Sequence, residues 1–201
     1  DTVLVSLMYV NNEIGAIQPI AEAAALIHRL NPDCYFHTDA VQAYGKFEIY
    51  PKRLGIDLLS ASSHKIAGPK GVGFLYKNRR VSLKPVSFGG GQQGGLRSGT
   101  LNAPGIAGMG EAAREAYSDF PAKRERLLVI KNRILAAALE IPGVSANSAP
   151  GMDSAPQILS LSVEGVRAEV LLHALEAEGI FVSSGSACAS NHPGISATLR
   201  G

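Results

Sequence analysis

The sequence has few cysteines and no long apolar run. Its only cysteines, Cys34 and Cys188, exclude a disulfide framework and a four-cysteine zinc site. Free thiols are typical of a reducing compartment, so we expect a cytoplasmic protein. No apolar run reaches the roughly 18 residues that a membrane span needs, and no basic and apolar leader opens the chain. The sequence therefore predicts neither a membrane partner nor secretion.

Charge is also low, with a formal net charge of +2. The 19 basic residues are scattered and form no stripe, which argues against a nucleic-acid partner. Hydrophobic residues make up 46% of the chain, enough for a sizeable core. The chain opens directly on a strand-like run and stops just after an expected helix start. Because termini usually lie in exposed, frayed segments, we expect it to be a piece of a longer protein.

Strands and helices are expected to alternate along the chain. This order predicts an α/β fold, with a mainly parallel sheet covered by helices on both faces. Such sheets bind ligands at the carboxyl ends of their strands. We expect two domains, 1–120 and 121–201, the second a smaller α/β domain. The expected strands are Val3–Val10, Cys34–Thr38, Asp57–Ser62, Gly71–Tyr76, Gln157–Val163 and Ile180–Ser183, and the expected helices are Ile20–Leu30, Gly105–Tyr117, Lys123–Leu139 and Ala168–Ala177.

A lysine follows one of these strands, in Ser62-Ser63-His64-Lys65. A lysine at a strand end beside serine and histidine can form a Schiff base with an aldehyde cofactor. Partial burial and cationic neighbours would lower its pKa and so make the neutral amine available. The alternative, taking these four residues alone, is a surface lysine in a loop.

An aspartate follows another strand, in the run His37 to Gln42. Asp39 can pair with a protonated pyridine nitrogen, which keeps the ring an electron sink, and Gln42 can bond a ring substituent. The alternative is that Asp39 caps the next helix, because aspartate is a favoured N-cap residue.

Two further segments carry candidate groups. Asn11-Asn12 precedes Gly15 and favours a turn, although an asparagine amide there can also contact a cofactor oxygen or a substrate carboxylate. Cys188 lies among small residues, Ser183 to Ser190, as an accessible nucleophile requires. Cys34 lies on an apolar strand and is expected to pack in the core.

Five segments of the chain, taken together, resemble the NifS/IscS-type cysteine desulfurases of the class V aminotransferase family. In chain order they are VNNEIG, HTDAVQAYGK, SSHKIAGPKGVG, GGGQQGGLRSGT and SSGSACAS. The resemblance covers nearly the whole chain. It implies the PLP-transferase fold type I, the cofactor pyridoxal 5'-phosphate (PLP) and the conversion of L-cysteine to L-alanine. It also implies a homodimer that passes sulfur to an Fe–S scaffold, or to an enzyme of tRNA or cofactor thiolation.

The resemblance also implies roles for single residues. Lys65 is similar to the Schiff-base lysine, which moves the substrate α-proton, and Cys188 to the cysteine that forms the persulfide. The implied cofactor contacts are the pyridine-nitrogen partner Asp39, the phenolic-oxygen contact Gln42, the phosphate contacts Ser62 and His64, the ring and substrate contact Asn12, and Thr100, which reaches the phosphate in the other subunit.

The chain departs from the family pattern in three respects. Ser63 stands where relatives have glycine, and Gln93-Gly94-Gly95 stands where many have Glu-Arg-Gly. An N-terminal phosphate-binding turn, a ring-stacking histidine and a C-terminal arginine that clamps the substrate carboxylate have no match. We therefore expect this polypeptide alone to be poorly active. The alternatives are a selenocysteine lyase, another fold-type-I PLP enzyme such as a kynureninase-like hydrolase, and a truncated piece that only binds.

Overall fold

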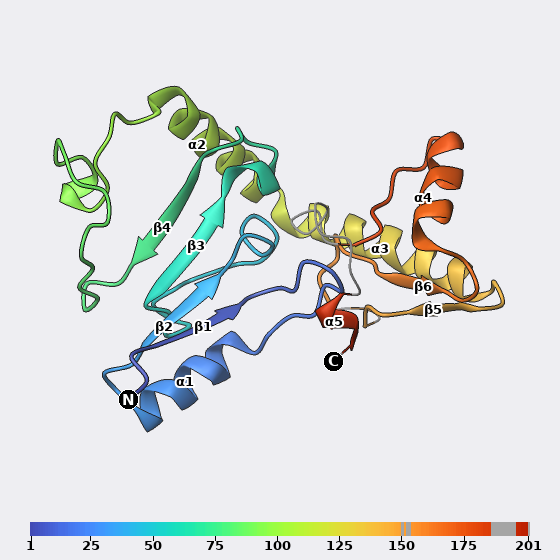
Figure 1. The fold of residues 1–201 in the computed structure, drawn as a ribbon, viewed down its shortest axis with the longest axis horizontal. Coiled ribbons are helices and arrows are strands. Elements are labelled where there is room, and N and C mark those ends of the chain that lie inside the picture. The colour runs from blue at the N-terminus through green and yellow to red at the C-terminus, as the bar shows by residue number, and fades with distance from the viewer. Residues whose placement is uncertain (150, 152–153, 186–195, 201) are drawn as a thin grey trace. The chain divides into compact units, whose positions relative to one another are not determined.

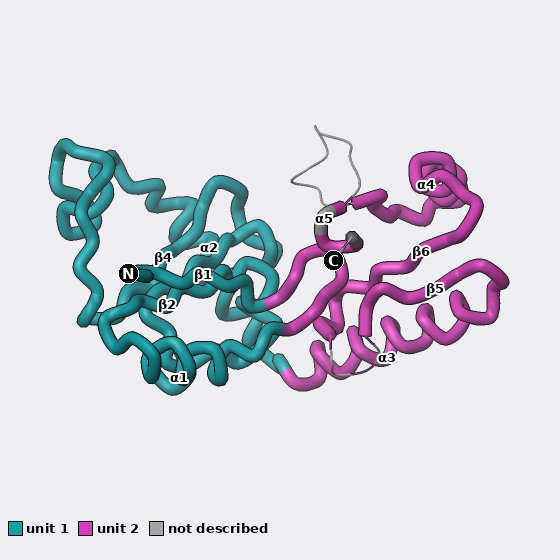
Figure 2. Tube along the Cα trace, turned by 60° about the horizontal axis from the view of Figure 1, so that its bottom comes forward, with its two compact units in different colours: residues 1–9, 18–120 teal, residues 10–17, 121–201 magenta. Residues whose placement is uncertain are grey.

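The structure is a computed structural model that describes residues 1–149, 151, 154–185 and 196–200. The chain forms two compact units, shown in Figure 2: unit 1 comprises residues 1–9 and 18–120, and unit 2 comprises residues 10–17 and 121–201. The sequence places residues 10–17 in the first domain, whereas they belong to unit 2. That the units are parts of a large and a small domain stays a prediction.

Unit 1 is built on a four-stranded sheet with the order β1-β2-β3-β4 (Figure 1). Strands β1 to β3 are parallel, and β4 runs antiparallel to β3. A parallel pair needs a crossover connection, which α1 supplies between β1 and β2. The elements of unit 1 are β1 (Leu4–Met8), α1 (Ile20–Leu30), β2 (Tyr35–Asp39), β3 (Leu58–Ser62), η1 (Ser63–Ile66), β4 (Gly73–Lys77), η2 (Gln93–Gly95) and α2 (Ala103–Tyr117).

The two faces of this sheet differ in burial. Phe36 and Thr38 of β2 are fully buried on one face, whereas His37 is half-buried and Asp39 exposed on the other. Alternate residues of a strand point to opposite faces. Among the described residues of β2, the second face is therefore the more exposed of the two. This more exposed face is the one that carries Asp39.

A charged cluster centred on the buried Asp57 joins α1, the residue before β3 and the loop that follows β4. Asp57, only 1% exposed, accepts hydrogen bonds from Arg80 Nε (2.5 Å) and from the backbone N–H of Phe36 (2.9 Å). His28 Nε2 of α1 lies 3.0 Å from the same carboxylate. Burial acts to raise the pKa of Asp57, but the hydrogen bonds from Arg80, Phe36 and His28 and the Arg80 charge hold it below its usual value. His28 therefore has a structural role.

We predict that this cluster makes the stability of unit 1 sensitive to acid. A depressed pKa means that the Asp57 contribution is complete above about pH 4, the unfolded value, and is lost as the pH falls through the folded value. Asp57→Asn should lower the free energy of unfolding by about 2 kcal/mol near neutral pH, because it removes the charge partner of Arg80, whose half-exposed guanidinium keeps part of its hydration. Denaturant unfolding from pH 7 down to pH 3 measures this. An unchanged acid dependence in the variant would contradict it.

Unit 2 consists of helices, a two-stranded antiparallel sheet and the segment 10–17. Sequence analysis missed β5, which has only three residues, and wrongly predicted a strand at Ile180–Ser183. That segment pairs with no strand within the described residues, and Phe181 is 82% exposed. The elements are α3 (Phe120–Leu139), β5 (Val144–Ala146), β6 (Leu161–Val163), α4 (Ala168–Ala177) and α5 (Ala197–Arg200).

Among the described residues, no helix combines the length and the apolar character needed to cross a membrane.

Candidate functional site

The lysine motif occupies the turn that follows β3. Ser62 ends the strand with extended backbone, and residues 63–66 form the single 3₁₀ turn η1. Ala67 closes this turn in a left-handed conformation (φ 62°), and its N–H donates to the Ser63 carbonyl. Ser62 Oγ and His64 Nδ1 are hydrogen-bonded at 2.7 Å. The turn therefore brings a hydroxyl, an imidazole and the half-buried Lys65 together at a strand end.

The backbone of Lys65 is held by a second lysine. Lys46 Nζ donates to the Lys65 carbonyl oxygen at 2.7 Å. The two cationic side chains lie near each other. Burial lowers the pKa of Lys46, and the nearby positive charge of Lys65 lowers it further. Sequence analysis asked for a cationic neighbour of Lys65 but did not name Lys46, because 19 residues separate the two.

Asp39 ends β2 and begins a turn rather than a helix. Its Oδ1 accepts a hydrogen bond from the backbone N–H of Val41 at 2.9 Å. The capping alternative is therefore right in part: Asp39 does cap local backbone, but residues 41–43 form turns. Within the described part of the chain Oδ2 makes no hydrogen bond, so an exposed carboxylate oxygen remains for a ligand. Gln42 follows in the same turn and is half-buried.

Strand register brings the Asp39 and lysine motifs to one edge of the sheet. Asp39 pairs with Ser60 in the parallel ladder, and paired residues share a face. Ser62, two residues on from Ser60, points to the same face. The carboxyl ends of β2 and β3 therefore present Asp39, Ser62 and the Lys65 turn side by side, as in sheets that bind ligands at their strand ends.

A polar row lies behind Asp39 on this face. His37 Nδ1 is 2.7 Å from Ser6 Oγ of β1, and His37 Nε2 is 3.2 Å from Ser60 Oγ of β3. Burial lowers the pKa of His37, although the negative charge of Asp39 acts in the opposite direction. Sequence analysis gave His37 no role, because only the strand register shows that serines flank it on both sides.

Ser63, the departure from the family glycine, is fully buried. Within the described residues its Oγ has no hydrogen-bond partner. The hydroxyl lies against Gly68, where a β-carbon would come within 2.1 Å of it. The serine is thus accommodated by an adjacent glycine and leaves the lysine turn intact.

We predict that Ser63→Ala stabilises the protein. A buried hydroxyl without a partner costs free energy, so its removal should raise the free energy of unfolding by about 1 kcal/mol. Ser60→Ala is the matched control, because it removes a hydroxyl that does bond His37 and should destabilise. Denaturant unfolding of the wild type and both variants tests the prediction, which fails if Ser63→Ala is less stable than the wild type.

Asn12 belongs to unit 2, in the turn of residues 10–17. Asn11 Oδ1 accepts from the N–H groups of Glu13 (2.9 Å) and Ile14 (3.0 Å), which makes the predicted turn. Gly15 completes it at φ +75°, where a side chain would be strained, and an added β-carbon would pack tightly against Ile158 at 3.1 Å. The neighbouring Asn12 is exposed. Asn11 therefore stabilises the turn, and the side chain of Asn12 lies on the surface.

Thr100 lies on the segment that leads from β4 into α2. It is exposed, and its neighbour Gly99 donates its N–H to Gln92 Oε1 at 3.0 Å. Gln93 and Gly94, in the altered part of the glycine-rich segment, both have left-handed backbone (φ 53° and 64°). Cys188 lies outside the described residues.

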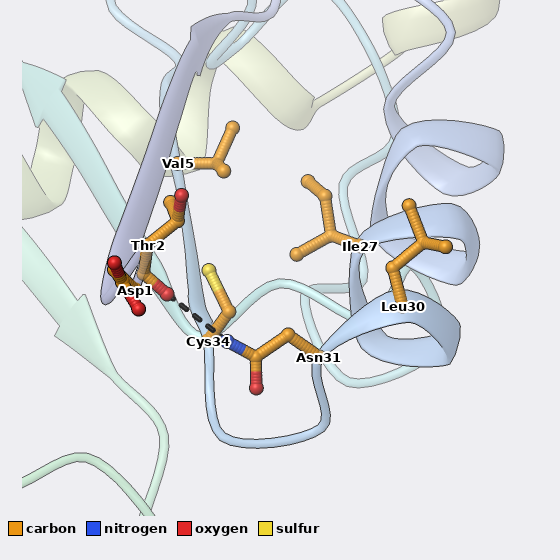
Figure 3. Close-up of a pocket in the computed structure, with 7 residues that line it drawn as sticks. All are labelled: Asp1, Thr2, Val5, Ile27, Leu30, Asn31 and Cys34. Atoms are coloured by element: carbon orange, nitrogen blue, oxygen red, sulfur yellow. Dashed lines mark hydrogen bonds between the residues drawn. The ribbon is translucent and has the colours of Figure 1, made fainter.

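A cavity of about 250 Å³ lies between β1 and α1. Cys34 lines it together with Val5, Ile27 and Leu30, as Figure 3 shows, and Asn31 Nδ2 donates to the Thr2 carbonyl at its edge (3.0 Å). None of the predicted site residues lines this cavity. Cys34 itself is 2% exposed, so its predicted place in the core is confirmed.

Comparisons with known proteins match the whole chain. The family model "Aminotransferase class-V" matches residues 1–201. A "NifS/IcsS protein homolog" of Lactobacillus delbrueckii subsp. bulgaricus is 45% identical over 99% of this chain and 52% of its own length. "Cysteine desulfurase IscS" of Methanosarcina thermophila is 42% identical over 95% of this chain and 46% of its own.

A solved "NifS-like protein" superposes with a TM-score of 0.85 at 37% identity, over 90% of this chain and 49% of that one. The predicted PLP-transferase fold type I is thereby confirmed. The chain spans about half the length of the curated relatives it matches.

Proposed function

Because the chain belongs to the aminotransferase class-V family, we propose that the protein acts as a PLP-dependent cysteine desulfurase. The observation that carries the proposal is the edge of the sheet in unit 1. There an exposed carboxylate at the end of β2 lies beside a lysine turn that also presents a hydroxyl and an imidazole.

These groups fit a phosphorylated pyridine aldehyde. Ser62 and His64 are hydrogen-bonding groups suited to a phosphate, Lys65 offers an amine to the aldehyde, and the free oxygen of Asp39 suits a protonated ring nitrogen. A neutral or basic side chain in place of Asp39 would not hold that proton. The proposed contacts of the cofactor are Asn12, Asp39, Gln42, Ser62, His64, Lys65 and, for the phosphate of a second subunit, Thr100.

The chemistry divides among three side chains. Bound PLP would supply an aldehyde for the substrate amine and a pyridinium ring that draws electrons from the substrate Cα. Asp39 holds the proton on the ring nitrogen, and Lys65 takes the proton from the substrate Cα and later returns one. The Cys188 thiolate forms a bond to the substrate sulfur while the carbon–sulfur bond breaks. The electron pair of that bond stays on the carbon, which is protonated to give L-alanine.

Partners of the whole protein are part of the same proposal. The persulfide on Cys188 would pass to an acceptor, either an Fe–S scaffold or an enzyme of tRNA or cofactor thiolation. In the same proposal Thr100, exposed on the segment between β4 and α2, contacts the phosphate bound in a second subunit of a homodimer. The cytoplasmic location stays a prediction.

The proposal is tested with the complete protein, PLP and L-cysteine. Alanine and sulfide released in equal amounts in the presence of a thiol reductant would support it. Release of pyruvate and ammonia, or no reaction of L-cysteine, would contradict it. Running the same assay on the 201-residue chain tests the expectation that this chain alone is poorly active.

A further inference from the structure

Lys46 lies in a turn whose two flanking peptide groups are fixed by one hydroxyl. Tyr117 of α2 accepts a hydrogen bond from the Gly45 N–H (3.0 Å) and donates one to the Phe47 carbonyl (3.1 Å). Burial raises the pKa of Tyr117, so the hydroxyl keeps the proton that it donates. The backbone on both sides of Lys46 is therefore anchored to α2.

The same turn contacts the lysine turn directly. A β-carbon at Gly45 would lie 2.6 Å from Ile66 Cγ2, and Gly45 has φ +77°, so only glycine suits this position. Ile66, the residue after Lys65, is 7% exposed. The close packing of Gly45 against Ile66 holds the turn of Lys46 within hydrogen-bonding reach of the Lys65 carbonyl.

The Lys65 carbonyl needs a donor that the local backbone does not supply. The two N–H groups that follow η1, those of Ala67 and Gly68, both donate to the Ser63 carbonyl. Lys46 Nζ donates to the Lys65 carbonyl at 2.7 Å, and a cation is favoured at this end of a helical turn. Lys46 thus holds the peptide group from which the Lys65 side chain departs.

We propose that Lys46 is a positioning residue for Lys65: with Tyr117 as its anchor, it fixes the Lys65 backbone so that the amine meets the cofactor aldehyde. The inference deepens the proposed function and rests on it. Lys46 itself touches neither substrate nor cofactor in this account. Replacing Lys46 should therefore slow the reaction of the Lys65 amine with the cofactor aldehyde more than replacing a lysine far from this turn does.

The test is borohydride trapping of PLP on the complete protein, followed by peptide mapping. Lys46→Met should reduce the rate of adduct formation on Lys65 about tenfold, the scale of a misplaced reacting group, and Lys46→Arg should restore most of it. Lys77→Met is the matched control, because Lys77 Nζ, at the end of β4, also donates to a backbone carbonyl, that of Val81 (2.8 Å) in the loop that follows. It should change the trapping rate less than about twofold.

Equal trapping rates in Lys46→Met and Lys77→Met, at comparable melting temperatures, would overturn the proposal. Amide hydrogen exchange of residues 63–68 without cofactor gives a second readout and should be faster in Lys46→Met only. If the wild-type protein forms no Lys65 adduct, the proposed function fails, and the exchange result alone decides the role of Lys46. Tyr117→Phe should act in the same direction and be less than additive with Lys46→Met.

Discussion

Replacing Lys65 by alanine is expected to reduce alanine release from L-cysteine by roughly 10³-fold or more in the complete protein. The side chain is proposed both to bind the cofactor covalently and to move the substrate α-proton, and a positioned acid–base group alone contributes about 10² to 10⁴. The variant should also lose the visible absorbance of lysine-bound PLP. Alanine release and the spectrum are measured on the same sample.

Lys70→Ala is the control for that experiment. Lys70 is an exposed lysine of the same motif, so its removal changes the net charge equally and should leave the activity unchanged. A Lys65→Ala protein that keeps its activity or its absorbance would show that another lysine binds the cofactor. The assignment of the lysine turn would then be wrong.

Replacing Cys188 by alanine is expected to abolish persulfide formation and lower alanine release from L-cysteine by about 10³-fold or more, because a nucleophile is lost. Cofactor binding should be unchanged, since Cys188 is not one of the proposed cofactor contacts. Mass spectrometry of the protein after reaction with L-cysteine detects the added sulfur.

The other cysteine provides the control. Cys34 is buried in unit 1, so Cys34→Ala should keep the activity and cost about 1 kcal/mol of stability. A Cys188→Ala protein that still cleaves selenocysteine but not cysteine would favour a selenocysteine lyase. One that still releases alanine from cysteine at the normal rate would contradict the proposed mechanism.

Much of the fold was predictable because local patterns agree with it. The helix at Ile20–Leu30 has the predicted bounds, since a proline precedes it and Asn31-Pro32 ends it. Asp39 and Lys65 were placed at strand ends from two apolar runs, and the parallel register then brings their motifs to one edge. The sequence pattern predicts which strand end each group follows, and only the register shows that the ends are adjacent.

Features that depend on distant parts of the chain were not predictable. The Ile180–Ser183 run has the composition of a strand, yet a strand forms only with a pairing partner. Segment 10–17 groups with unit 2 because Gly15 and Ser154-Ala155 are joined by backbone contacts, such as the bond from the Ala155 N–H to the Gly15 carbonyl (2.8 Å). Lys46 bonds Lys65 and Arg80 bonds Asp57, pairs that are 19 and 23 residues apart, so no local sequence motif predicts them.

The most direct test of the central claim is to reduce the wild-type complete protein with borohydride after PLP is added, and to map the adduct by mass spectrometry. The account predicts a yellow protein whose reduced adduct lies on the peptide that contains Lys65. A protein that stays colourless, or an adduct spread over several exposed lysines, would contradict it.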